Sequence, residues 1–253
     1  MIQHSILLVQ KVQNIFEFSV NSTQTISGQF STSPGETITV EWGDGGSDDY
    51  TGIDQNWSKD YGSAVNQTVT IHNASALTKF QMDEGGADIS FDLSDLPSGL
   101  TYFGCTGSNT VSGDIADLPS GLTSLTCSGS NTISGDIADL PSGLTSFSCS
   151  GSNTISGNLA DLPSGLTNFT CLGSNTISDY TGKTWTTRPT TFNLRGNAAL
   201  STAEVDQLLI DFDDDLTWDS GSINITGSCE GRSATSDAAV TSITGEGASV
   251  TTN

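Results

Sequence analysis

The sequence LTSLTCSGSNTISGDIADLPSG (122–143) decides the fold, because close copies of it recur along the middle of the chain. LTYFGCTGSNTVSGDIADLPSG (100–121) precedes it directly, and LTSFSCSGSNTISGNLADLPSG (144–165) follows it. A fourth copy, LTNFTCLGSNTISDYTGKTWTT, occupies 166–187, and a looser one, LTKFQMDEGGADISFDLSDLPSG, occupies 77–99. A repeat of this length predicts a solenoid, in which each copy forms one coil stacked on the next.

Apolar residues occupy the same positions in every copy. In the second full copy they are Leu122, Leu125, Cys127, Ile133, Ile137 and Leu140. The fourth and sixth positions are two residues apart, which predicts a short strand with these two side chains turned inward. The second half of the copy has no helical periodicity and ends in Pro141 and Gly143, so it predicts an extended or 3-10 return path and a turn.

Two further columns of identical residues run through the repeat. Cys105, Cys127, Cys149 and Cys171 would stack on strands ~4.8 Å apart, and this spacing is poorly suited to a disulfide, whose Cβ atoms lie ~3.8 Å apart. We therefore expect free thiols that act as small buried hydrophobic side chains. Asn109, Asn131, Asn153 and Asn175 form the second column. We expect them to face inward and to hydrogen-bond backbone groups of the adjoining coil.

The repeat resembles the leucine-rich repeat, L-x-x-L-x-L-x-x-N-x-L-x-G-x-I, with Cys in place of the third leucine. The chain departs from that family because four residues separate Cys from Asn instead of three. The later segment TTFNLRGNAAL restores the family spacing through Phe192, Leu194 and Asn197. The resemblance implies a leucine-rich-repeat solenoid over residues 77–200 and no particular ligand, since the family recognises many unrelated partners.

Residues 14–74 predict a small antiparallel β-sandwich. FEFSV, QTISGQF, TITVEWGDG and QTVTIHN are alternating, β-branched stretches separated by turns. Trp42 is expected to pack inward, while Gly43 and Gly45 permit a tight turn around Asp44. The W-x-G-D-G sequence of this turn resembles polycystic-kidney-disease-type (PKD-like) domains. That resemblance implies an immunoglobulin-like sandwich, typical of spacer or adhesion modules on extracellular proteins.

Residues 201–253 predict a short α/β cap that covers the open apolar end of the solenoid. STAEVDQLLIDF (201–212) is a helix with a Ser201–Glu204 capping box and one apolar face. A strand in GSINITG (221–227), a second helix after it and a last strand, SVTT (249–252), complete the cap. This end resembles leucine-rich modules of bacteriophage tail and fibre proteins. The whole chain is therefore expected to be mainly β.

Charge and composition exclude several classes of function. The 253 residues carry a net charge of −22, and no Lys or Arg lies between Lys79 and Lys183, which argues against a nucleic-acid partner. No stretch approaches the ~20 apolar residues of a membrane span. The start MIQHSILLVQKVQ (1–13) lacks the long apolar core of a secretory signal, so we expect a cytosolic product or export by another route.

The outward positions of the predicted repeat strands form a surface of hydroxyl groups. The candidate ligand-binding residues are Tyr102, Thr123, Ser124, Thr126, Thr145, Ser146, Ser148, Thr167, Asn168 and Thr170. Such a surface suits recognition of glycans, and regular threonine arrays on flat solenoids also bind ice. Alternatively, small hydroxyl side chains simply pack well on an exposed sheet and keep it soluble.

Acidic residues are the remaining candidates for chemistry. Asp44, Asp48 and Asp49 cluster near the predicted turn and are candidate calcium ligands, although Asp also caps turns and aids solubility. The pairs Asp114/Asp117 and Asp136/Asp139 recur as structural residues do, whereas a catalytic pair is normally singular. With only His4 and His72, no G-x-S-x-G elbow and no phosphate-binding loop, the chain is expected to be no enzyme and to need no cofactor.

These observations favour a non-enzymatic structural or adhesion protein of a bacteriophage virion, as a tail, fibre or head-surface component. Residues 1–13 would then form an arm that docks on other virion proteins, and the solenoid would bind a host-surface glycan or protein. The alternatives are a bacterial cell-surface or secreted leucine-rich adhesin and, third, a glycan-active enzyme. Repeats this similar also favour side-by-side assembly, so a homo-oligomer is expected.

Overall fold

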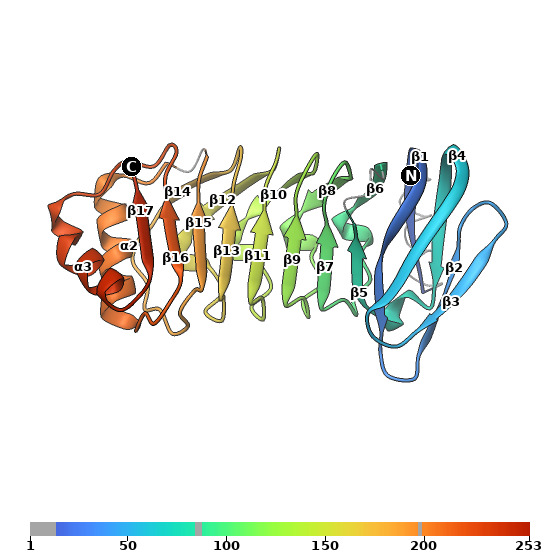
Figure 1. The fold of residues 1–253 in the computed structure, drawn as a ribbon, viewed down its shortest axis with the longest axis horizontal. Coiled ribbons are helices and arrows are strands. Elements are labelled where there is room, and N and C mark those ends of the chain that lie inside the picture. The colour runs from blue at the N-terminus through green and yellow to red at the C-terminus, as the bar shows by residue number, and fades with distance from the viewer. Residues whose placement is uncertain (1–13, 84–87, 197–198) are drawn as a thin grey trace. The chain divides into compact units, whose positions relative to one another are not determined.

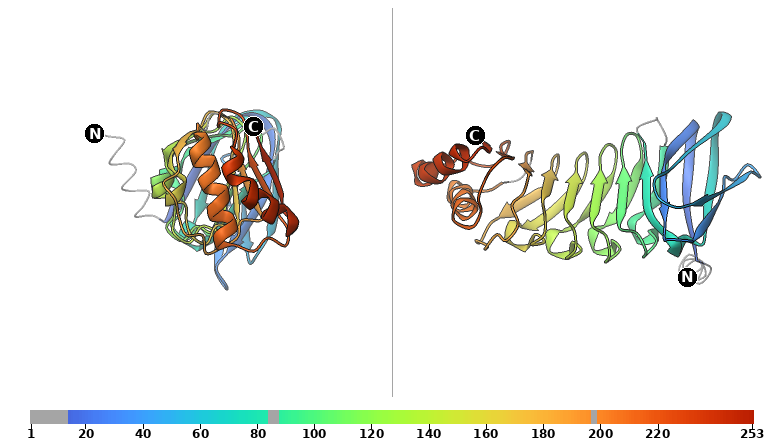
Figure 2. Two further views of the ribbon diagram at one scale, coloured as in Figure 1. Left: turned by 90° about the vertical axis from the view of Figure 1, so that its left-hand side faces the viewer. Right: turned by 60° about the horizontal axis from the view of Figure 1, so that its bottom comes forward.

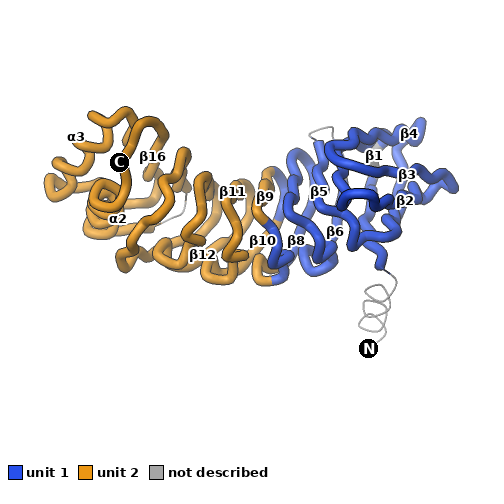
Figure 3. The backbone as a smooth tube through the Cα atoms, turned by 90° about the horizontal axis from the view of Figure 1, so that it is seen from below, with its two compact units in different colours: residues 1–113, 117–122, 129–131 blue, residues 114–116, 123–128, 132–253 orange. Residues whose placement is uncertain are grey.

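The computed structural model describes residues 14–83, 88–196 and 199–253, which are mainly β-structure with two α-helices (Figure 1). These residues separate into two compact units (Figure 3). Unit 1 consists of Met1–Gly113, Asp117–Leu122 and Gly129–Asn131, and unit 2 consists of Asp114–Ala116, Thr123–Ser128 and Thr132–Asn253. The predicted docking arm, residues 1–13, lies outside the described residues.

Unit 1 begins with antiparallel strands, as the alternating pattern predicts. They are β1 (Ile15–Thr32), β2 (Thr37–Glu41), β3 (Ser47–Thr51) and β4 (Gln55–His72). β1 pairs with β4, and β2 lies between β3 and β4. Phe16 and Phe18 alternate with half-exposed residues along β1 and contact Phe80 at ring-centroid distances of 5.2 and 5.5 Å. The alternation therefore builds an aromatic core on one face of the sheet.

Two strands of unit 1 differ from the prediction. FEFSV and QTISGQF are expected as separate strands, but both belong to β1. The register against β4 shifts between Asn21 and Thr25, so a bulge bends the strand where the sequence suggests a turn. The SDDYT strand, β3, is missed altogether because it has no apolar alternation. It is an exposed edge strand that pairs only with β2 among the described strands, and its two Asp residues suit such an edge.

Strand β1 also pairs with the first, looser repeat copy. Its residues Ser19–Asn21 pair with β6 (Asp88–Asp92), and Gly28–Thr32 pair with β5 (Leu77–Met82), both antiparallel. β7 (Tyr102–Cys105) and β8 (Thr110–Asp114) then continue from β5 and β6 as parallel strands. The antiparallel strands and the first coil therefore share hydrogen bonds within unit 1. The domain boundaries at residues 74 and 200 stay predictions.

Unit 2 contains a parallel ladder, here called the front ladder, that takes one strand from each repeat copy of this unit and three strands from the residues after the last copy. Its strands are β9 (Ser124–Cys127), β11 (Ser146–Cys149), β13 (Asn168–Cys171), β15 (Thr191–Leu194), β16 (Ser222–Ile225) and β17 (Ser249–Thr252). The return ladder consists of β10 (Thr132–Asp136), β12 (Thr154–Asn158) and β14 (Thr176–Asp179). The 3-10 turns η4 (Ile137–Asp139) and η5 (Leu159–Asp161) follow β10 and β12, which confirms the predicted extended and 3-10 return path.

The interior of the coils follows the repeat positions. In the third full copy the apolar residues are all buried, namely Leu144, Phe147, Cys149, Ile155, Leu159 and Leu162. The five cysteines are buried and form no disulfide, which the spacing predicts for the four of the repeat. Asn153 is fully buried as well, where its Oδ1 accepts a hydrogen bond from Ile133 N at 2.9 Å and its Nδ2 donates to Ser150 O at 3.0 Å. Asn153 thus ties its own turn to the preceding coil, which confirms the predicted role of the Asn column.

Glycines allow the backbones of adjacent coils to lie in close contact at the turns after the front strands. Gly173 has a φ of +99°, and a Cβ at this position would lie 2.2 Å from Gly151 O. Gly196 has a φ of +103°, and its Cβ would lie 2.4 Å from Gly173 O. Both the positive φ and the short distance to the neighbouring backbone exclude a side chain at these two positions. The backbones of successive turns therefore stack directly on one another.

The C-terminal part of unit 2 carries the two helices, α2 (Thr202–Asp215) and α3 (Asp237–Gly245), which pack against each other (Figure 2, left). Ser201 caps α2, and Glu204 completes the predicted capping box. The predicted strands of this region are β16 and β17, and they extend the front ladder. Within the described residues, neither helix has the length and apolar character needed to cross a membrane.

Candidate functional site

The outward side chains of the front ladder form two rows, here called the front rows. The first row consists of Ser124, Ser146, Asn168, Thr191, Ser222 and Ser249, and the second consists of Thr126, Ser148, Thr170, Asn193, Asn224 and Thr251. Each residue lies beside its counterpart on the next strand, ~4.8 Å away. The rows contain only hydroxyl and amide side chains, which both donate and accept hydrogen bonds.

The structure brings nine of the ten predicted ligand-binding residues together on unit 2. Ser124, Thr126, Ser146, Ser148, Asn168 and Thr170 lie in the front rows, and Thr123, Thr145 and Thr167 lie just before the strands. The remaining residue, Tyr102, lies on β7 in unit 1. The repeat alone does not indicate that the rows continue over β15, β16 and β17. The signal for them is the alternation in TTFNL, SINI and SVTT.

The predicted threonines before the strands also join one coil to the next. Thr145 Oγ1 donates to Thr123 O at 3.0 Å, and Thr167 Oγ1 donates to Thr145 O at 3.0 Å. Thr190 Oγ1 bonds Thr167 O in the same way at 3.0 Å. Because these hydroxyl protons are engaged by the backbone, this column offers a ligand mainly methyl groups and hydroxyl acceptors.

The three candidate calcium ligands each have a protein partner. Asp44 forms an ion pair with Lys59 at 2.6 Å and accepts a hydrogen bond from Gly46 N at 2.9 Å, and the bond from Lys59 lowers the pKa of its carboxyl. Asp48 accepts from Trp42 Nε1 at 2.7 Å, and Asp49 accepts from Thr39 Oγ1 at 2.6 Å. The described residues contain no group of three or more His, Cys, Asp or Glu side chains placed to hold a metal ion. Trp42 is buried, as predicted.

The recurring aspartates cap the 3-10 turns. Asp136 Oδ1 accepts a hydrogen bond from Ala138 N, and Asp114 Oδ1 accepts from Ala116 N, both at 2.9 Å. In the next copy Asn158 takes the same position and accepts from Ala160 N at 2.9 Å. Since a neutral amide serves equally well, this column needs an oxygen acceptor rather than a charge.

We therefore expect Asp136→Asn to leave the free energy of unfolding nearly unchanged, because Asn and Asp cap equally well. Asp136→Ala should lower it by about 1 kcal/mol through loss of the cap. Urea unfolding followed by circular dichroism measures both values. An Asn variant as unstable as the Ala variant would show that the carboxylate charge itself matters.

Burial disfavours the thiolate form of three thiols of the Cys column. It raises the pKa of Cys105 and of Cys149 to about 12, and it raises the pKa of Cys171 well above its ordinary value. Only the thiolate attacks electrophiles or binds metals readily, so these side chains are protonated and inert at neutral pH. Cys105, Cys149 and Cys171 therefore act as small apolar side chains that fill the core.

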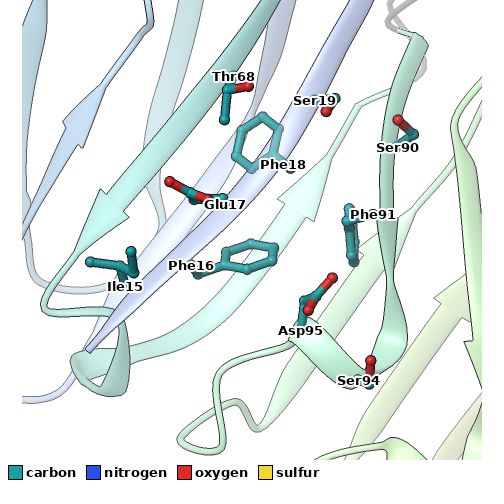
Figure 4. A pocket seen from close by; sticks show the side chains of 10 residues that line it. All are labelled: Ile15, Phe16, Glu17, Phe18, Ser19, Thr68, Ser90, Phe91, Ser94 and Asp95. Carbon is teal, nitrogen blue, oxygen red and sulfur yellow. The ribbon is translucent and has the colours of Figure 1, made fainter. Parts of the chain in front are cut away.

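Unit 1 has a pocket of 310 Å³ where β1 and β6 diverge (Figure 4). Its lining consists of Ile15, Phe16, Glu17, Phe18, Ser19, Thr68, Ser90, Phe91, Ser94 and Asp95. Phe16, Phe91 and Asp95 face one another across the wedge, whereas Glu17 accepts a hydrogen bond from Thr70 Oγ1 at 3.2 Å. Phe16 is only 2% exposed and Phe91 9%, so the rings offer little surface for stacking.

The candidate site is therefore a regular polar surface on unit 2 with a separate aromatic position, Tyr102, on unit 1. Asp114 and Asp136 of the recurring acidic pairs lie outside both parts, as caps of the 3-10 turns. Comparison of the chain with protein-family models, with curated proteins and with solved structures finds no match.

Proposed function

We propose that the protein is a non-enzymatic recognition protein that binds an uncharged, hydroxyl-rich ligand, a glycan, on the front rows of unit 2. The observation that carries this proposal is the continuity of the rows. Hydroxyl and amide side chains occupy every outward position across six parallel strands, in register. A repeating polar surface of this kind matches a ligand that itself repeats hydroxyl groups along its length.

The charge of the rows supports a neutral ligand. The chain carries a net charge of −22, yet the front rows hold no charged side chain. An anionic ligand would be repelled by the chain as a whole, and a cationic one would find no carboxylate in the rows. A neutral saccharide needs no charged partner on the protein, because hydrogen bonds and exclusion of water supply its binding energy.

The proposal includes the family assignments made from the sequence. Residues 77–200 form a leucine-rich-repeat solenoid, residues 14–74 a PKD-like sandwich, and residues 201–253 the cap of the solenoid. The buried repeat positions support the first assignment, and the buried Trp42 beside Gly43 and Gly45, both at positive φ, supports the second.

The setting proposed for this recognition is a bacteriophage virion, with the chain as a tail, fibre or head-surface component. The resemblance of the helical C-terminal end to leucine-rich modules of bacteriophage tail and fibre proteins supports it. Cryo-electron microscopy of the native source material tests it. Density for the chain at symmetric positions on a capsid or tail is the expected result, and a chain found free or on a cell envelope would favour the bacterial adhesin.

The front rows are tested by adding charge at their centre. Ser148 and Thr170 are neighbours in the second row, so S148E/T170E introduces two adjacent carboxylates. We expect this variant to lose at least about 10-fold in affinity for whichever neutral oligosaccharide the wild-type chain selects on a glycan array, because the buried charges would lack partners.

The matched control places the same charges on the return ladder. T154E/T176E alters two exposed residues of β12 and β14 and should bind like the wild type. Equal binding by S148E/T170E and the wild type would exclude the front rows as the site. A wild-type chain that binds no glycan but slows ice growth would point to the ice-binding alternative instead.

A further inference from the structure

Tyr102 is a large residue at a position where the later copies have small or amide side chains, and a second change, at Gly104, accompanies it. The position of Tyr102 is Ser124, Ser146 or Asn168 in the later copies. Two residues further on, where those copies have Thr126, Ser148 and Thr170, this copy has Gly104. A large ring and a missing side chain therefore occur together on one strand, β7, and alternate residues of a strand lie on the same face.

The geometry explains why the two changes belong together. A Cβ added at Gly104 would lie 3.0 Å from Tyr102 Cε1 and 3.1 Å from Tyr102 Oη. The ring therefore lies along the sheet over Gly104, in the space that a side chain would otherwise fill. Gly104 has no positive φ, so space and not backbone conformation is what requires glycine here. Tyr102 itself stays half-exposed, and it covers Gly104, which is buried.

Polar side chains border the ring within unit 1. Lys79 Nζ lies over the Tyr102 ring, 5.0 Å from its centroid, and it donates to Gln29 Oε1 at 2.6 Å and to Asp54 Oδ1 at 2.8 Å. Gln29 Nε2 in turn donates to Asn56 Oδ1 at 2.8 Å. Gln81 lies two residues further along the same strand as Lys79, β5, beside Gly104, with its Cγ 3.4 Å from the Cβ position of Gly104. Asp54 balances the ammonium charge of Lys79, and Gln81 Nε2 donates to Asp83 Oδ1 at 3.2 Å, so polar groups surround the ring.

We propose that Tyr102 and the polar side chains around it, Lys79, Gln29 and Gln81, form a subsite for one neutral pyranose unit of a glycan. The aromatic face carries negative charge density and attracts the weakly positive C–H groups on one face of a sugar ring. The amides of Gln81 and Gln29 and the ammonium of Lys79 are the hydrogen-bonding groups for its hydroxyls. This proposal rests on the proposed function and names, in addition, one position in unit 1 where a sugar stacks.

Three variants test the subsite in the full-length chain. The probe is a panel of neutral hexose and N-acetylhexosamine oligosaccharides, with affinities measured by isothermal titration calorimetry. We expect Tyr102→Ala to weaken binding of the selected oligosaccharide at least about 10-fold and Tyr102→Phe to keep it within about 3-fold, since the ring remains. Gly104→Thr installs the residue of the next copy and should weaken binding as Tyr102→Ala does, because it displaces the ring.

A spectroscopic measurement separates stacking from a structural effect. Saturation-transfer difference NMR should show contact between one face of the sugar and the aromatic protons of the wild type, and that contact should be absent in Gly104→Thr. Unchanged circular dichroism shows that each variant is folded. Wild-type affinity in Tyr102→Ala together with weak binding in S148E/T170E would overturn the subsite and leave the front rows standing. A wild-type chain that binds none of the panel would overturn both proposals.

Discussion

Replacement of Asn153 by leucine is expected to lower the free energy of unfolding by about 2–6 kcal/mol. The Asn153 side chain is fully buried and satisfies two backbone groups, Ile133 N and Ser150 O. Leucine bonds neither, and each buried backbone group left without a partner costs about 1–3 kcal/mol. Urea unfolding followed by circular dichroism measures the loss.

The neighbouring Ser152 provides the control for that measurement. It is exposed in the same turn, so Ser152→Ala should change the free energy of unfolding by less than about 0.5 kcal/mol. An Asn153→Leu variant as stable as the wild type would mean that the Asn column does not hold neighbouring coils together.

Alkaline pH is expected to destabilise the fold steeply through the Cys column. Burial raises the pKa of Cys105 and Cys149 to about 12 in the folded chain, while an exposed cysteine in the unfolded chain ionises near ~8.5. The unfolded chain therefore releases protons first. Stability is complete below the unfolded pKa, and each thiol lowers it by about 1.4 kcal/mol per pH unit between ~8.5 and the folded value.

Urea unfolding under reducing conditions at several pH values between 8 and 11 measures this slope. Cys149→Ala removes one of the thiols and should reduce the slope by about 1.4 kcal/mol per pH unit. An identical slope in the variant and the wild type would assign the alkaline loss to other buried groups, such as Tyr180, whose pKa is also raised by burial.

The repeat made most of unit 2 predictable. Identical positions in successive copies must face the same environment in a stack, so the inward Leu144, Phe147 and Cys149 and the bridging Asn153 follow from spacing alone. Unit 1 was harder to predict because its sequence does not repeat. Strand β3 has no apolar pattern of its own and is defined by its pairing with β2. The bulge in β1 lies in a polar stretch whose sequence resembles a turn.

The candidate site was predictable only in part. The outward residues of β9, β11 and β13 follow from the repeat, whereas β15 to β17 continue the rows with sequences that no longer match it. Asp136 acts as a cap because its Oδ1 accepts a hydrogen bond from Ala138 N. The spacing of the repeat does not indicate this bond. Gly104 does stand out when the copies are aligned, but its reason is three-dimensional, because the Tyr102 ring occupies the space of the missing side chain.

The backbone stacking at Gly151, Gly173 and Gly196 has a genetic consequence. Each coil meets its neighbours through the same columns, so a copy such as 144–165 is interchangeable with the one before it. Unequal recombination between such copies would remove or add one whole coil and keep the Gly, Asn and Cys columns continuous. The front ladder, and with it the proposed binding surface, would then lengthen or shorten in steps of ~4.8 Å without any change to the fold of the remaining coils.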